Sequence, residues 1–385
     1  MKIVVPVWGQ NYVDTFLKLS LPTQLSPLNI PKISKKHKVI YVIYTTRKDK
    51  KFIESSDIFI RLSKYANIEF SFVNNIFNKK VYTLYRKIHY IELKKSSKKD
   101  ECVFLFNSDM IMSDQFMYRA IKIMKTHKVI NVFCPRTLEE PIKKFYANNA
   151  NSNYHLKITA QTLNKLWFQN CHPLMKYHFL PKKNKEQILP ATFIWQPKKN
   201  VVYVRSFHLH PVLVYPKNKK INKFRTTIDA GPIYHIFNSW EIYTEKSNKD
   251  LFIIELSPKQ RYYNGAGYVN LANTYVGYFQ LQDRFNFKNF ESEIVVGDLS
   301  LAEIKKLRQV SDQFIATILL KYLYSNTIKY TELLKVFNYI VRFIYSKRNL
   351  FPNFLFIFMQ KIYRKIIKTV FKSSIDYKDY VRFDS

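Results

Sequence analysis

The sequence contains little glycine and little cysteine. Only 6 of its 385 residues are glycine, and no glycine-rich loop stands near the N-terminus, where nucleotidyltransferases usually cradle phosphates. Its three cysteines, Cys102, Cys134 and Cys171, are too few and too widely spaced to indicate a zinc site or a disulfide framework. We therefore expect buried free thiols in a reducing compartment.

Long hydrophobic runs are also missing. No stretch approaches the roughly 18 apolar residues that a membrane-spanning helix needs. The best run, at residues 350–359, is interrupted by Pro352 and Asn353, and the apolar run at residues 2–7 is too short for a signal peptide. We expect a cytoplasmic protein.

Acidic residues are scarce relative to basic ones. The chain has 28 Asp and Glu against 63 Lys and Arg, a formal net charge of +35. Such an excess indicates an anionic partner, which could be nucleic acid, a membrane leaflet or a phosphorylated substrate. The frequent Lys, Asn, Ile, Tyr and Phe are also typical of an AT-rich genome, which would account for part of the charge without any partner.

The remaining composition predicts a folded α/β protein. Hydrophobic residues make up 47% of the chain and aromatic residues 16%, which excludes a disordered chain. Short apolar runs, separated by segments of helical periodicity, predict buried strands at residues 2–7, 39–45, 68–73, 103–106 and 129–134. This alternation is typical of a mostly parallel sheet with helices on both faces.

The chain changes character twice after these strands. Residues 141–200 are polar and lack a clear period, which predicts an insertion, and strand-like runs return at residues 201–205, 207–215 and 250–256. From residue 301 onward the spacing is helical. We therefore predict one domain at residues 1–300, with the insertion, and a helical basic tail at residues 301–385.

One stretch suggests a site at a strand end. In ECVFLFNSDMIMSDQ, residues 101–115, an apolar strand ends in Asn107, Ser108 and Asp109. Ligands of open α/β sheets bind beyond the carboxyl ends of the strands, so a carboxylate there is well placed to hold Mg²⁺ or Mn²⁺ against a diphosphate. A plain strand-to-helix turn, with Asp109 or Ser113 as N-cap, is the structural alternative.

Two later segments carry further candidates. In SFHLHPVLVYP, His208 and His210 lie two apart on a predicted strand, so both rings should point to one face. They could bind a metal or phosphate oxygens, or simply face solvent. In FRTTIDAG, Asp229 follows a strand-like run at a turn, where it could serve as a general base, a metal ligand or an ordinary Asx-turn residue.

Together these segments resemble a known family. VPVWG, FNSDMIMSD, CPRTLEEP, FHLHPVLVYP and FRTTID look like a bacterial family of GT-A-fold glycosyltransferases that is often linked to surface polysaccharides, over residues 1–260. The strand ending in Asn107-Ser108-Asp109 is similar to the DxD motif of that fold, with an amide in place of the first acid. The resemblance implies a GT-A-like sheet and a Mn²⁺ or Mg²⁺ ion, with metal ligands among Asn107, Asp109, His208 and His210.

The resemblance also implies a set of residues that bind the nucleotide sugar. The set comprises Pro6, Val7, Trp8, Thr46, Arg47, Ser108 and Arg136. Trp8 could form a wall for the base, or be a core aromatic residue. Arg136 could hold a diphosphate with two hydrogen bonds, or form a local ion pair. Asp229 is then the expected base that accepts the proton of the acceptor hydroxyl.

The tail has its own pattern. Residues 342–372 hold eight Lys or Arg and no acid, interleaved with Phe, Ile, Leu and Tyr. This pattern is typical of a helix that lies in a membrane interface, where anionic lipids attract each nearby cation by about 1 kcal/mol. A helical subdomain with a solvated basic face is the alternative.

We therefore predict a glycosyltransferase, peripheral on the inner membrane through its tail. It would move a sugar from a nucleoside-diphosphate sugar to a surface glycan or lipid-linked glycan, and no nucleic-acid partner is expected. One alternative is a basic nucleic-acid-binding protein, although the sequence has no helix-turn-helix, RNP or zinc signature. Another is a non-catalytic transferase-like module that binds glycan or lipid.

Overall fold

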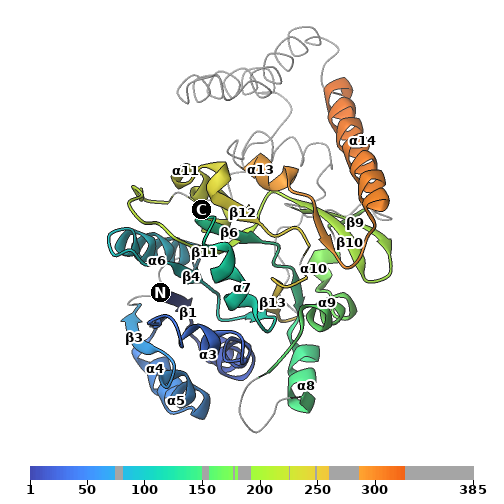
Figure 1. Ribbon diagram of the computed structural model, residues 1–385. Helices are drawn as coiled ribbons and strands as arrows, with labels where there is room; N and C mark the ends of the chain where they lie inside the picture. Colours follow the sequence, from blue (N-terminus) through green and yellow to red (C-terminus); the bar gives the residue numbers. More distant parts are fainter. Residues whose placement is uncertain are drawn as a thin grey trace. The chain divides into compact units, whose positions relative to one another are not determined.

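A computed structural model (Figure 1) describes most of the first 325 residues of the chain. The described ranges are 1–73, 81–149, 156–176, 178–180, 192–224, 226–247, 249–259 and 286–325. The chain divides into two compact units, one of residues 1–274 with 282–313 and one of residues 275–281 with 314–385. All of the predicted site residues lie in the first unit.

A seven-stranded sheet occupies the centre of the first unit, in the order β12–β6–β11–β4–β1–β2–β3. The strands are β1 (Lys2–Pro6), β2 (Ile40–Thr45), β3 (Asn67–Phe72), β4 (Val103–Leu105), β6 (Val129–Val132), β11 (His210–Val214) and β12 (Ile242–Thr244). All neighbouring pairs are parallel except those that β11 makes with β4 and β6. A mostly parallel sheet with flanking helices confirms the predicted α/β fold.

Each face of the sheet packs into a hydrophobic cluster of its own. Ile3 and Val5 of β1 belong to one cluster and Val4 to the other, and all three are fully buried. This follows from the alternation of side chains along a strand. Because both faces are covered, each strand appears in the sequence as a continuous apolar run and not as an alternating one.

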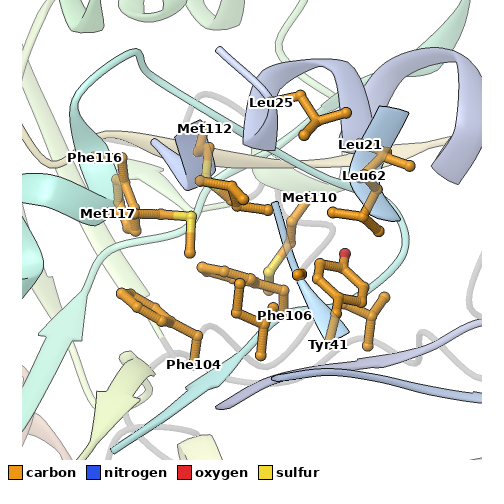
Figure 2. Packing of buried hydrophobic residues seen from close by; sticks show 14 of the residues in the cluster. Leu21, Leu25, Tyr41, Leu62, Phe104, Phe106, Met110, Met112, Phe116 and Met117 are labelled. Carbon is orange, nitrogen blue, oxygen red and sulfur yellow. The ribbon is translucent and has the colours of Figure 1, made fainter. Parts of the chain in front are cut away.

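Short helices cover the first face. They are α1 (Gln10–Thr15), a π-helical turn (Phe16–Ser20), α2 (Leu21–Gln24), α3 (Ile30–Ile33), α4 (Arg47–Glu54), α5 (Asp57–Ser63) and α7 (Phe116–Ile123). Figure 2 shows their packing: Phe104 of β4 and Phe106, which follows it, lie beside Phe116 and Met117 of α7, while Tyr41 of β2 lies nearer Met110 and Leu62. On the second face lie α6 (Val81–Ser96) and α11 (Pro232–Ile236).

Two smaller sheets build a third cluster around the fully buried Trp167. One has the order β14–β10–β9–β8 and the other β5–β13–β7. Their strands are β5 (Met110–Met112), β7 (Arg136–Leu138), β8 (Phe179–Leu180), β9 (Thr192–Lys198), β10 (Val201–Ser206), β13 (Ile253–Ser257) and β14 (Ile294–Val296). The associated helices are α8 (Glu139–Asn149), α9 (Ala160–Gln169), α10 (Pro173–Lys176) and α13 (Asn286–Glu291).

The described part of the predicted insertion at residues 141–200 contributes to this third cluster. Leu163 and Trp167 of α9 pack there with Ile194 of β9. These elements have regular structure although the sequence shows no period.

The predicted tail begins with a helix, α14 (Leu301–Ser325). The basic segment at residues 342–372 lies outside the described residues. Among the helices of the described ranges, none combines the length and the apolar character needed to cross a membrane.

Candidate active site

The candidate site lies at the carboxyl edge of the central sheet. The parallel strands β1, β2 and β4 end there, and the antiparallel strand β11 begins there. The Nε2–H group of His210, the first residue of β11, donates a hydrogen bond of 2.9 Å to the carbonyl oxygen of Leu105, the last residue of β4. The strand order thus brings His210 beside the Asn107–Ser108–Asp109 segment.

The segments after β1 and β2 are linked by Asp49, a residue outside the predicted site. Gly9 donates its backbone N–H to Asp49 Oδ2 at 2.9 Å, and the Thr46 hydroxyl donates to the same oxygen at 2.8 Å. The Thr46 hydroxyl also accepts the backbone N–H of Asp49 at 3.0 Å and so caps α4. The signal that could have revealed Asp49 is the capping spacing Thr-x-x-acid.

The predicted nucleotide-binding residues of these segments differ in their surroundings. Pro6 and Val7 are buried and Trp8 is half-buried. The Trp8 ring lies 5.5 Å from that of Tyr85 on α6. Arg47 is exposed, and its guanidinium lies 4.8 Å from the centre of the Phe72 ring.

The carboxylate of Asp229 interacts with the charges of both predicted histidines. Asp229 is half-buried in a 3-10 turn, η3 (Ile228–Ala230). Burial alone would raise its pKa, but His208 and a hydrogen bond from Thr227 oppose it. His210 acts in the same direction, and the net effect is a pKa below the ordinary value. Asp229 is therefore ionised at neutral pH and can accept a proton or attract a cation.

The two histidines do not share one strand, so that part of the prediction was wrong. β10 ends at Ser206 and β11 begins only at His210, which leaves His208 in the connection. Ser206 Oγ donates to the His208 carbonyl at 2.8 Å and accepts the His208 N–H at 3.3 Å. Such a local side-chain bond competes with strand pairing. The histidines still come together around Asp229, but through a turn and not through strand alternation.

His89 on α6 belongs to the same group and was also missed. It is 4% exposed, and neither ring nitrogen has a hydrogen-bond partner within the described residues. Burial and, after it, the charge of His210 lower its pKa to about 3, while Asp229 acts in the opposite direction. His89 is therefore neutral at physiological pH. Its only sequence signal is its place four residues after Tyr85, on the buried stripe of an amphipathic helix.

The partly exposed thiol of Cys134 lies near Asp109 at this edge of the sheet. Cys134 follows β6, and its pKa lies well above the ordinary value because of burial and the nearby carboxylates of Glu255 and Asp109. Asp109 itself is 7% exposed, and its carbonyl accepts the N–H of Leu256 at 2.8 Å. Ser108 is buried, and Asn107 is half-buried.

Arg136 forms a local ion pair, which was the predicted alternative to diphosphate binding. Its guanidinium is bonded to the carboxylate of Glu255 on β13, and the two side chains are 21% and 19% exposed. A diphosphate bound by Arg136 would therefore have to compete with Glu255.

The described side chains do not enclose a metal ion by themselves. Within the ranges that the structure describes, no three His, Cys, Asp or Glu side chains gather closely enough to hold one. Mg²⁺ usually keeps ligand positions for phosphate oxygens and water. A cation at Asp109 would thus need the substrate for part of its coordination.

Comparison with known proteins gives only weak likenesses. No protein-family profile and no curated protein matches the sequence. Among solved structures, the chain is similar to residues 1–349 of S. aureus TarS in complex with UDP-GlcNAc. The identity is 14% and the TM-score 0.35, over 88% of this chain and 79% of that one.

Two further solved structures match a smaller part of the chain. A galactosyltransferase, LgtC, with donor and acceptor sugar analogues matches at 12% identity and TM-score 0.23, over 34% of this chain and 46% of that one. A putative glucose-1-phosphate thymidylyltransferase from Bacillus anthracis matches at 10% identity and TM-score 0.24, over 37% and 56%. In a shorter alignment with TarS, the chain spans 36% of the solved chain.

Proposed function

We propose that this protein is a glycosyltransferase that uses a nucleoside-diphosphate sugar as donor. One observation carries the proposal. The ionised carboxylate of Asp229 interacts with His208 and His210 at the carboxyl edge of the sheet, where open α/β folds bind their ligands.

Asp229 is the proposed base. As the acceptor hydroxyl oxygen attacks the anomeric carbon, its proton would pass to the Asp229 carboxylate and the nucleoside diphosphate would leave with the electrons of the broken bond. A positioned carboxylate typically contributes a factor of about 10²–10⁴ to such a step. The lowered pKa of Asp229 means that the carboxylate is ionised at neutral pH. It is a weaker base than an ordinary aspartate, so it would take the proton only as the bond to the anomeric carbon forms and the hydroxyl becomes acidic.

The donor would lie across the ends of β1, β2 and β4. Pro6, Val7 and Trp8 on one side and Thr46 and Arg47 on the other are held together by the bonds to Asp49. Ser108 and Arg136 complete the proposed set. Mn²⁺ or Mg²⁺ remains the proposed cofactor, bound jointly by Asp109 and the donor diphosphate, with Asn107, His208 and His210 as further candidate ligands.

The acceptor and the location are proposed from the sequence pattern. A surface glycan, such as capsule or lipopolysaccharide, or a lipid-linked precursor of one, is the proposed acceptor. The basic segment at residues 342–372, with eight cations and no acid, is proposed to hold the protein on the cytoplasmic face of the inner membrane.

Calorimetric titration tests the donor site. The panel should contain nucleoside diphosphates and their sugars, with and without Mn²⁺, and should include UDP and UDP-GlcNAc, which the TarS crystals contain. We expect Asp109→Ala to weaken Mn²⁺-dependent binding at least about tenfold, a loss of about 1.4 kcal/mol. Asp298→Ala is the matched control, because that side chain is 85% exposed.

Turnover separates the base from the binding residues. Asp229→Asn should bind the donor as the wild type does and should lose about 10²-fold or more in rate. If no nucleotide binds and DNA or RNA binds tightly with a steep salt dependence, the protein is a nucleic-acid-binding protein instead. Donor binding with no transfer to any glycan would favour the non-catalytic module.

A further inference from the structure

The amino-terminal edge of the central sheet, opposite the candidate site, carries a lysine-rich surface. Five connections form this surface, here named the basic edge: residues 34–38, 97–101, 125–128, 215–220 and 238–241. They precede β2, β4, β6 and β12 or follow β11. In Figure 1 the N-terminus, which begins β1, marks this edge.

Backbone hydrogen bonds join these connections into one surface. Asn218 donates to the Ser97 carbonyl at 3.1 Å, and Tyr215 donates to the Lys128 carbonyl at 2.7 Å. Lys128 in turn donates to the Glu241 carbonyl at 2.6 Å. At the other end, the N-terminal amino group donates to the Lys38 carbonyl at 3.0 Å.

The basic edge has a large excess of cations. It holds ten lysines and three acids, Asp100, Glu101 and Glu241. Each acid has a lysine partner: Lys217 lies 2.7 Å from Asp100, Lys219 lies 2.8 Å from Glu241, and Lys2 lies 3.4 Å from Glu101. Seven exposed lysines have no acidic partner among the described residues, namely Lys35, Lys36, Lys38, Lys98, Lys99, Lys125 and Lys220.

An exposed tryptophan stands among these lysines. Trp240 is 73% exposed, in a short 3-10 turn, η4 (Ser239–Glu241). Its neighbour Glu241 is bonded to Lys128 and Lys219 of the basic edge. A tryptophan ring prefers the boundary between water and hydrocarbon, where one end is wet and the other apolar.

We propose that the basic edge binds a membrane surface that contains anionic lipids. Each lysine near such a surface contributes about fivefold in affinity. All ten cations are lysines, whereas arginine is the usual choice for nucleic-acid phosphates because of its planar fork. Docking through this edge leaves the carboxyl edge, where the candidate site lies, open to its ligands. The inference depends neither on the proposed function nor on the tail.

Vesicle sedimentation of the full chain tests this surface. The probes are phosphatidylcholine vesicles with and without phosphatidylglycerol. One variant combines Lys35→Glu, Lys36→Glu, Lys98→Glu and Lys220→Glu. Its control makes the same change of charge elsewhere, at the exposed Lys157, Lys165, Lys305 and Lys306.

We expect the basic-edge variant to bind anionic vesicles at least about tenfold more weakly than the wild type. The control should lose much less, because distant charges are screened at physiological salt. Trp240→Ala should weaken binding several-fold without changing thermal stability, since that side chain is exposed. Neither variant should change nucleotide affinity, so a failure here is distinct from a failure of the proposed glycosyltransferase site.

Three results would overturn the assignment. Equal losses in the two quadruple variants would show that net charge alone matters. A loss confined to a variant with Lys361, Arg364, Lys365 and Lys368 changed to Glu would assign binding to the tail. Weaker binding of DNA or RNA by the basic-edge variant, with unchanged vesicle binding, would assign the surface to nucleic acid.

Discussion

The backbone N–H of Gly9 donates a 2.9 Å hydrogen bond to the carboxylate of Asp49, 40 residues away in sequence. This bond joins the segment after β1 to the first turn of α4, the two segments proposed to flank the nucleotide. Gly9 has φ 82°, a left-handed conformation that costs glycine little and other residues more. The geometry of the proposed nucleotide site therefore depends on one buried carboxylate.

Replacing Asp49 should loosen both the fold and the site. Asp49→Ala removes the charged acceptor of Gly9 and Thr46, and hydrogen bonds to a charged group are typically worth about 1.5–3 kcal/mol. We expect that loss in urea unfolding, together with weaker nucleotide binding in calorimetry. Asp298→Ala, at a side chain that is 85% exposed, should change stability by less than about 0.5 kcal/mol. Wild-type stability of Asp49→Ala would contradict the inferred role of Asp49.

His89 should make the protein less stable in mild acid. The pKa of His89 in the folded protein is about 3, below the ordinary value of about 6.5. Between these two pH values the imidazole therefore binds a proton in the unfolded chain but not in the folded one. The free energy of unfolding should therefore fall by up to about 1.4 kcal/mol per pH unit between pH 6.5 and 3. His89→Gln should flatten this slope in urea unfolding at several pH values.

An exposed histidine provides the control for that slope. His235→Gln, at the exposed end of α11, should leave the slope as in the wild type. If His89→Gln and the wild type lose stability in parallel as the pH falls, then the protonation of His89 does not cause the pH dependence of the free energy of unfolding.

Removing one partner of the buried pair Lys2 and Glu92 should destabilise the protein more than replacing both with apolar residues. Their charged atoms lie 3.1 Å apart, with side chains 6% and 1% exposed. Glu92→Gln leaves Lys2 with Glu101, 3.4 Å away, as its remaining acidic partner and removes the charged member of a buried ion pair, so we expect a loss of about 2 kcal/mol in the free energy of unfolding. The double change Lys2→Met with Glu92→Leu should recover much of it. Purely additive losses in this double-mutant cycle would show that the two residues are not coupled.

Cys134 should report ligand binding and Cys102 should not. Both thiols are partly exposed and have raised pKa values, chiefly because of burial, so both should react slowly with iodoacetamide at pH 7.5 and faster at higher pH. Cys134 lies beside Asp109 at the carboxyl edge, whereas the Cys102 carbonyl accepts the N–H of Lys2 at the opposite edge. A bound nucleotide should protect Cys134 several-fold, as measured by peptide mass spectrometry. Equal protection of both thiols, or of neither, would contradict the proposed position of the ligand.

The strands of the central sheet were predictable because they are buried on both faces. The runs at residues 2–7, 39–45 and 129–134 correspond to β1, β2 and β6. The short strands β5 and β7 were not predicted, because each is three residues long and pairs with β13 more than 100 residues later. Pairing over such a distance leaves no local period in the sequence.

The sequence by itself determined which residues stand at strand ends, since apolar runs stop where the chain leaves the core. Thr46 follows β2 and Asn107 lies close behind β4 for that reason. Only the tertiary structure decided that His89 joins His210 and Asp229, and that Glu255 takes the guanidinium of Arg136. These groups lie 19 to 140 residues apart along the chain. Strand order and helix packing bring these groups together. The local periodicity of the sequence predicts neither the order of the strands nor the packing of the helices.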